Sequence, residues 1–340
     1  MKTRVLFILT GLLAVSPLAA ADSDTTWQFA PADAKAFIGI HWRDIQESRI
    51  GQAMRQQMAE AGFSGAPMLG ILKDIDEAII ASPGRRPDDP EDKQPPVLIR
   101  VTGRFHAADI ERMLAAQGAH PQLYRQKRVY RQQKDGDMAI TLLDDHTLLL
   151  GDAPSIFAAL TRMEWPTAPA NPTAARAAKL REDYDIWAVF TMAPTEMAGR
   201  LMPNLPLIGD AQGLELGISL RSGLEFRLGL DTASGESAAK LTSELQKTLK
   251  LAVKDMHAPD VAAAAKKLQI SAEKSTVRVS LRLDAAEVER SLAEAARRRA
   301  QRPAVAIALP SHPVVPPPPQ RQTIHIEGLD DGPRDIPMSR

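Results

Sequence analysis

The residues that could act in catalysis do not occur at the spacings that known catalytic motifs require. Ser-x-x-Lys, which brings an amine near a hydroxyl on a helix, occurs at Ser237–Lys240 and again at Ser271–Lys274. The companion motifs of penicillin-recognising enzymes, Ser-Asp-Asn and Lys-Thr-Gly, are absent, and so is the Gly-x-Ser-x-Gly elbow of serine hydrolases. The second copy also falls in an expected hairpin turn. The sequence therefore assigns no catalytic residue and favours a protein that is not an enzyme.

Metal and cofactor sites are not predicted either. No two histidines have the four-residue helical spacing of a zinc ligand pair; they stand at positions 41, 106, 120, 146, 257, 312 and 325. Asp88, Asp89, Glu91 and Asp92 crowd one loop, but the spacing and central glycine of a calcium-binding EF-hand are missing. The chain has no cysteine, which excludes disulfides, zinc–thiolate sites and iron–sulfur clusters.

The charge balance argues against a nucleic-acid partner. Forty-two Lys and Arg residues face 42 Asp and Glu residues, so the chain has no long-range field that would attract phosphates. Aromatic residues make up only 4% of the chain, so surfaces on which bases could stack are scarce.

The N-terminus has the order of a bacterial export signal. Lys2 and Arg4 precede an apolar run that is too short for a stable membrane anchor. Small residues, Ala19 and Ala21, then occupy the positions that a signal peptidase reads, which predicts a signal peptide over residues 1–21. No later segment has 18 consecutive apolar residues, so we expect no transmembrane anchor after cleavage. The predicted location is the periplasm or the medium.

Hydrophobic periodicity predicts alternating strands and helices in two similar runs. In the first run we expect strands at 36–41, 77–82, 97–105, 123–132, 137–143 and 147–150, with helices starting at Ser48, His106 and Asp152. In the second run we expect a strand at 185–192, a short helix at 194–201, hairpins at 214–230 and 268–283, and helices at 241–252 and from Asp284. Asp284 and Glu287 have the spacing of a capping box.

Each run reads as strand, helix, strand, strand, helix, strands and helix. This order predicts an α+β protein of two tandem ferredoxin-like halves, β-α-β-β-α-β plus extra elements, with antiparallel sheets and helices on one face. The expected organisation is a signal peptide (1–21), a first α+β repeat (22–164), a Pro/Ala-rich linker (165–180), a second α+β repeat (181–300), a Pro-rich linker (301–322) and a strand-like tail (323–340).

The sheet faces away from the helices would carry polar side chains, which makes them a candidate interaction surface. The tail contains the alternating segment Thr-Ile-His-Ile-Glu, which could add a strand to a sheet edge of its own chain or of a partner. The candidate surface residues are Arg100, Arg104, Arg221, Arg227, Arg278, Arg282, Ile324 and Ile326.

These observations favour a non-catalytic protein of the cell envelope that binds or assembles with another, unidentified protein. Two alternatives stay open. One is an extracytoplasmic hydrolase whose active site is assembled from residues distant in sequence. The other is a carrier that holds an apolar ligand between the two halves.

Overall fold

The computed structural model describes residues 25–60, 73–84, 96–131, 138–164, 171–191, 211–255, 259–301, 323–326 and 334–337. The predicted signal peptide, the acidic loop at 88–92, the helix at 194–201 and the Pro-rich linker lie outside these residues. The chain forms two compact units, Met1–Glu294 and Ala295–Arg340.

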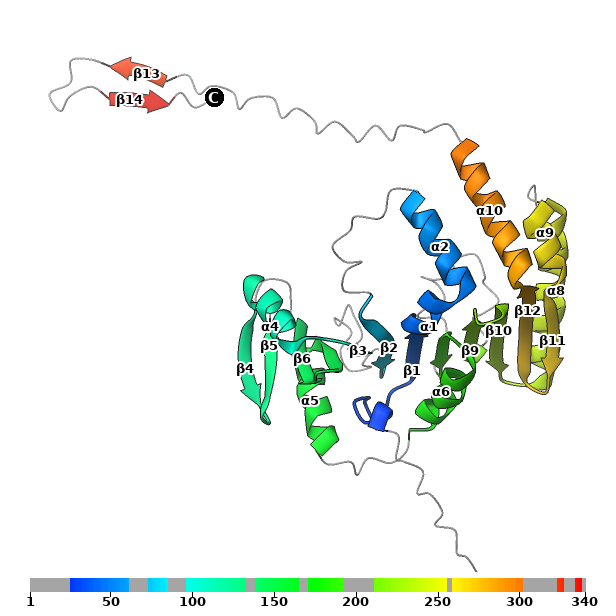
Figure 1. Cartoon of the computed structure of the whole chain (residues 1–340), viewed down its shortest axis with the longest axis horizontal. Coiled ribbons are helices and arrows are strands. Elements are labelled where there is room, and N and C mark those ends of the chain that lie inside the picture. The colour runs from blue at the N-terminus through cyan, green and yellow to red at the C-terminus, as the bar shows by residue number, and fades with distance from the viewer. Residues whose placement is uncertain are drawn as a thin grey trace, which may run out of the picture. The chain divides into compact units, whose positions relative to one another are not determined.

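One antiparallel sheet of twelve strands forms the centre of the first unit (Figure 1). The strand order is β11-β12-β10-β9-β8-β1-β2-β3-β7-β6-β5-β4. The strands are β1 (Ala36–His41), β2 (Ile75–Ser82), β3 (Leu98–Gly103), β4 (His120–Tyr124), β5 (Lys127–Arg131), β6 (Met138–Asp144), β7 (Thr147–Asp152), β8 (Ile186–Phe190), β9 (Ala211–Ser219), β10 (Gly223–Thr232), β11 (Gln269–Glu273) and β12 (Thr276–Asp284).

The helices of the described residues connect these strands. A short 3₁₀ turn, η1 (Thr25–Trp27), precedes β1. The α-helices are α1 (Trp42–Glu47), α2 (Arg49–Glu60), α4 (Ala107–Ala116), α5 (Ala153–Glu164), α6 (Pro172–Asp183), α8 (Gly235–Asp255), α9 (Pro259–Lys266) and α10 (Ala285–Gln301). The prediction of a mixed α+β protein with antiparallel pairing is confirmed.

The two halves of the sequence share this sheet, and they meet where β1 pairs with β8. Outward from this pair, β2, β3 and β7 follow on one side, and β9, β10 and β12 follow on the other. The ferredoxin-like topology is not confirmed. A split β-α-β unit places another strand between its two parallel strands, whereas β1 pairs directly and antiparallel with β2.

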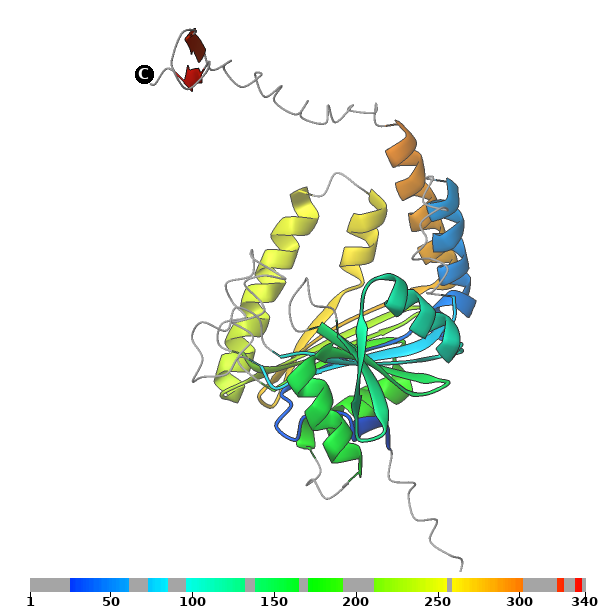
Figure 2. The ribbon, with the colours of Figure 1, turned by 90° about the vertical axis from the view of Figure 1, so that its left-hand side faces the viewer.

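Helices cover both faces of the sheet, not one face as predicted (Figure 2). We name the faces by their helices: the α6 face lies under α5 and α6, and the α8 face lies under α4 and α8. In β3, Leu98 packs on the α6 face, while Ile99 and Val101 pack on the α8 face. Leu98 lies on the same side of β3 as Arg100 and Thr102, yet it is 1% exposed. A strand that is covered on both sides has no polar face to alternate with.

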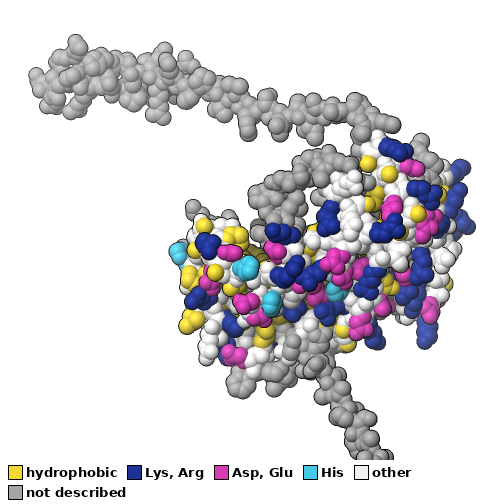
Figure 3. All heavy atoms as spheres, in the orientation of Figure 1, with side chains coloured by type: hydrophobic (Ala, Val, Ile, Leu, Met, Phe, Trp, Pro, Cys, Tyr) yellow, Lys and Arg dark blue, Asp and Glu magenta, His cyan; other side chains and the backbone are white. Residues whose placement is uncertain are grey.

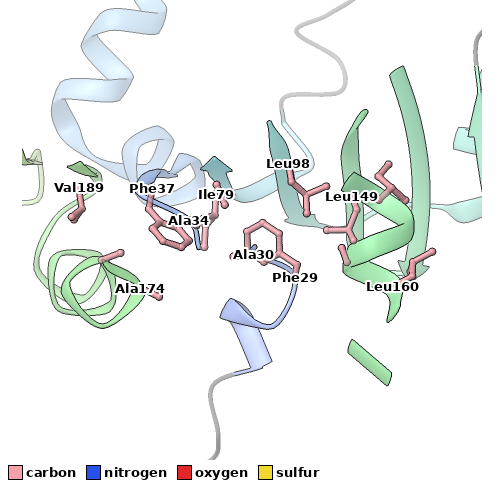
Figure 4. Packing of buried hydrophobic residues seen from close by; sticks show 14 of the residues in the cluster. Phe29, Ala30, Ala34, Phe37, Ile79, Leu98, Leu149, Leu160, Ala174 and Val189 are labelled. Atoms are coloured by element: carbon pink, nitrogen blue, oxygen red, sulfur yellow. The ribbon is translucent and has the colours of Figure 1, made fainter. Parts of the chain in front are cut away.

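The largest core cluster lies on the α6 face, between the central strands and helices α5 and α6 (Figure 4). Phe37 and Ile79 extend into it from β1 and β2, and Phe29 enters it from the turn after η1. Trp187 of β8 is fully buried and lies over Gly39 of β1, where even a single methyl group would come within 2.1 Å of the ring. The first strand of each half is therefore fixed against the other by a close contact.

Side-chain caps begin several helices where the sequence predicts them. Ser48 Oγ accepts the Gly51 N–H at 3.0 Å at the start of α2, and Asp152 Oδ1 accepts the Ser155 N–H at 2.8 Å at the start of α5. Asp284 accepts the N–H of Glu287 at 2.8 Å, and Glu287 accepts the N–H of Asp284 at 3.2 Å. This reciprocal pair is the predicted capping box of α10.

Two segments differ from the prediction. Residues 172–180, expected within a linker, form most of α6, because Asn171 caps the helix, Pro172 occupies its first turn, and Ala174 and Ala177 are buried. The strand expected at 123–132 is instead a hairpin of β4 and β5. Its two turn residues, Arg125 and Gln126, both have positive φ, which is the conformation of a tight two-residue turn.

The C-terminal unit contains the predicted strand at Thr323–Ile326, labelled β13. It pairs antiparallel with β14 (Arg334–Pro337), which the sequence did not predict. Among the described strands, these two form a sheet of their own. Among the described helices, none combines the length and the apolarity needed to cross a membrane.

Candidate functional site

The candidate site is a polar sheet face, which we define as the α6-face side of β9, β10, β12 and β11 beyond the reach of α6. Directly paired residues of antiparallel strands point to the same side of a sheet. Arg282 lies opposite Glu225, Arg227 opposite Ser280, and Arg278 opposite Gly229. Three of the predicted surface arginines therefore share one face, and their apolar neighbours Leu228 and Leu230 point to α8.

The arginines of this polar sheet face are well exposed. The side chains of Arg282 and Arg278 are 79% and 52% exposed, and they reach Glu225 at 2.7 Å and Glu273 at 2.5 Å. Arg227 is also exposed. Exposed ion pairs contribute about 0–1 kcal/mol to stability. These charges therefore do little for the fold. In the space-filling view, cationic and acidic side chains are interspersed over this region (Figure 3).

Arg221 borders the polar sheet face but is bound to the body of the protein. It follows the end of β9, and its Nε donates to Asp185 Oδ1 at 2.9 Å. Asp185 is 1% exposed, and its other oxygen accepts the Leu220 N–H at 2.5 Å. A buried carboxylate needs hydrogen-bond donors. Arg221 supplies one to Asp185 and so stabilises the junction between β8 and β9.

The other predicted surface residues are not brought together with these. Arg100 is only 17% exposed and faces Glu77, with Nη1 at 3.8 Å from Oε2. Arg104 is exposed in the turn after β3. Ile324 and Ile326 belong to β13 in the second unit, in register with Ile336 and Arg334 of β14.

The sequence reasoning missed a buried charge cluster around Glu77. Arg181 of α6 donates to Glu77 through Nε at 2.6 Å and through Nη2 at 3.1 Å, and Glu77 is 6% exposed. His41 Nδ1 lies 3.5 Å from the same carboxylate, and its other ring nitrogen lies 2.9 Å from the Arg181 carbonyl. The cluster ties α6 to β1, β2 and β3. A signal was present, because a glutamate within an apolar strand needs a partner if it is buried.

A second missed feature is a cavity of about 410 Å³ where β2 ends and β3 begins, beside α5. Its lining contains an acid, an amine and a hydroxyl, namely Asp33, Lys35 and Ser155. The Ser155 hydroxyl, however, donates to Asp152 Oδ2 at 2.6 Å as part of the α5 cap. This hydroxyl is therefore engaged in helix capping and is not poised as a nucleophile. Among the described residues, no three histidines or acids gather as a metal site.

Comparison with known proteins assigns no family. No family model and no curated protein matches the chain. Among solved structures, crystal form I of TP0453 superposes with a TM-score of 0.46 at 10% identity, covering 79% of this chain and 96% of that one. Crystal form IV of TP0453 superposes with a TM-score of 0.46 at 9% identity, covering 79% and 95%. At this level the similarity assigns neither a ligand nor an activity.

Proposed function

We propose that this chain is an exported, non-catalytic protein of the cell envelope that binds a partner protein through the polar sheet face and the neighbouring edge strand β11. The observation that carries the proposal is the common face of Arg227, Arg278 and Arg282. These arginines alternate with acids on an open sheet surface. Arginine is enriched in protein interfaces because its planar guanidinium can bond and stack at once.

The edge of the sheet beside this surface supports the same interpretation. β11 has one neighbour, β12, so its outer edge has no strand partner among the described residues, and only the Ile270 carbonyl is seen to accept a side-chain hydrogen bond, from Gln246 at 2.9 Å. Natural edge strands are protected by proline or lysine. The opposite edge, β4, contains Pro121, whereas β11 reads Gln-Ile-Ser-Ala-Glu and contains neither residue. An extended segment of a partner could therefore pair with β11 while contacting the polar sheet face.

The organisation predicted from the sequence is part of this proposal. Export rests on the leader at 1–21, and the tandem relation of the two halves is supported by the matching strand orders on either side of β1 and β8. The tail contributes to partner binding through β13 and β14. Deleting residues from Arg302 onward should reduce partner capture without lowering stability. An unchanged set of captured proteins would remove the tail from the proposal.

A photo-crosslinking residue at position 227 tests the binding surface directly. We expect one dominant crosslinked partner in envelope extract, because the position lies at the centre of the polar sheet face. The matched control places the same crosslinker at Arg112, which is 77% exposed on α4. The triple variant Arg227→Glu, Arg278→Glu and Arg282→Glu should abolish capture, while Lys240→Glu, Lys247→Glu and Lys250→Glu on α8 should not. Equal crosslinking from both positions would contradict the proposal.

A further inference from the structure

The cavity beside α5 has walls that are fixed before any ligand arrives. Four prolines line it, Pro31, Pro83, Pro96 and Pro154, and proline has a single preferred φ. Ser82 joins the two sides of its mouth, since its Oγ donates to the Pro96 carbonyl at 2.8 Å and accepts the Gly84 N–H at 3.1 Å. The cavity is therefore preorganised, which lowers the entropic cost of binding.

The segment before β1 forms another wall and is held from two sides. The Lys35 N–H donates to the Ser82 carbonyl at 2.9 Å. The side-chain amide of Asn171 donates to the carbonyls of Ala32 and Ala34, each at 3.0 Å. These bonds place Lys35 at the rim of the cavity, and its ammonium group forms no ion pair with another described residue.

The charge of the lining favours an anion. Two cations, Lys35 and Arg162, face one acid, Asp33. Arg162 uses Nη2 to bind the Phe29 carbonyl at 2.7 Å, and its buried Nε finds no hydrogen-bond acceptor among the described residues. Burial also lowers the pKa of the Arg162 guanidinium. Asp33 attracts this guanidinium, but the lining holds one more cation than acids, so an anionic oxygen in the cavity would be attracted as well.

Apart from Ser155 and Gly84, the rest of the lining is apolar. Ala81, Leu98 and Ala158 join the four proline rings. A volume of about 410 Å³ is in the range of small-molecule sites and exceeds what a bare inorganic anion would fill. We propose that this cavity binds a small amphipathic anion, a carboxylate or phosphate ester with an aliphatic body, whose charged head contacts Arg162 and Lys35 and whose body lies against the proline walls.

Calorimetric titration of the full chain with four probes tests the chemistry. Octanoate should bind saturably, and inorganic phosphate should bind more weakly because it leaves the apolar walls uncovered. Octanol and octylamine should not bind measurably, because neither supplies an anionic head. Binding of octanol as tight as that of octanoate, or no saturable binding of octanoate, would overturn the proposal. Phosphate binding as tight as that of octanoate would show that the apolar walls add nothing to affinity, and it would overturn the claim that the ligand has an aliphatic body.

Variants locate the site. Arg162→Met keeps the aliphatic stem and should weaken octanoate binding about ten-fold or more, the expected loss for a hydrogen bond to a charged group. Lys35→Met should weaken it less, and it provides a second readout if Arg162→Met fails to fold. Ala158→Leu should block the cavity, whereas Ala115→Leu on the exposed side of α4 should leave affinity unchanged. Unchanged affinity in both Lys35→Met and Ala158→Leu would place any binding elsewhere and overturn the assignment.

Discussion

The guanidinium of Arg181 holds the carboxylate of Glu77 at two points, Nε to Oε1 at 2.6 Å and Nη2 to Oε2 at 3.1 Å. The two residues are 104 positions apart in sequence, and they join α6 of the second half to β2 of the first. Arg181 is the closest cation to Glu77, and removing one member of such a buried pair is more costly than removing both.

We therefore expect Arg181→Met to lower the free energy of unfolding by about 3 kcal/mol. Glu77→Gln should have a similar effect, because it leaves Arg181 facing a neutral amide. The double variant Glu77→Gln with Arg181→Met should lose less stability than the sum of the two single losses. Urea unfolding measures these differences, with Arg112→Met on the exposed face of α4 as the control. Additive single losses in the double variant would contradict a coupled pair.

The contact between Trp187 and Gly39 gives a second prediction. A methyl group on Gly39 would lie 2.1 Å from the Trp187 ring, which is fully buried and cannot turn away. Overpacking of this kind costs about 1–3 kcal/mol, and we expect Gly39→Ala to reach the upper end. Gly229→Ala is the matched control in another strand, because its nearest atoms are 3.8 Å away. Tryptophan fluorescence during urea unfolding measures the free energy of unfolding of both variants. Equal stability of the two variants would contradict this packing.

Local patterns predicted most of the elements, because each depends on residues close in sequence. The β9–β10 hairpin, with its turn before Gly223, and the capping box of Asp284 and Glu287 are confirmed. The β4–β5 hairpin was missed because its turn uses Arg125 and Gln126 at positive φ instead of glycine or asparagine.

Non-local features could not be predicted in the same way. Leu98 is buried because α5 and α6 cover its side of β3, whereas Arg100 and Thr102, which follow on the same side, indicate an uncovered face. The same holds for the candidate sites. Arg227, Arg278 and Arg282 could be assigned to one face from strand periodicity alone, whereas Arg162 and Lys35 meet only because the fold brings α5 to the end of β2.

Asn171 gives a third prediction, because its side chain both caps α6 and binds the segment before β1. Its Oδ1 accepts the N–H groups of Thr173 at 2.8 Å and Ala174 at 3.2 Å, which caps α6. Its amide nitrogen donates to the carbonyls of Ala32 and Ala34, which flank the cavity-lining residues Asp33 and Lys35. Asn171→Ala should lower the free energy of unfolding by about 1–2 kcal/mol, the loss typical of a removed helix cap.

Asn171→Asp separates the accepting role of this side chain from its donating role. It keeps the capping oxygen but turns a carboxylate toward the carbonyls of Ala32 and Ala34. We expect it to be destabilised as well, and to bind octanoate more weakly than the parent chain because the wall loosens. Thermal unfolding and calorimetry measure the two effects. If both the thermal stability and the octanoate affinity matched those of the parent chain, the hydrogen bonds donated by Asn171 would contribute to neither.

Glu287 gives a pH-dependent prediction whose sign follows from its partners. The hydrogen bond from Lys267, and after it the one from the Asp284 N–H, lower the pKa of Glu287 below its ordinary value of 4.5. A carboxyl group whose pKa is lower in the folded state stabilises that state above the unfolded-state pKa. This contribution is complete at neutral pH and is lost as the pH falls through the lowered folded-state pKa.

Lys267→Met should therefore move the pKa of Glu287 back up toward 4.5, which carboxyl-carbon NMR titration measures directly. Lys266→Met, one position away on the exposed side of α9, should leave the titration unchanged. Identical midpoints in the parent chain and in Lys267→Met would mean that the lysine does not hold this carboxylate.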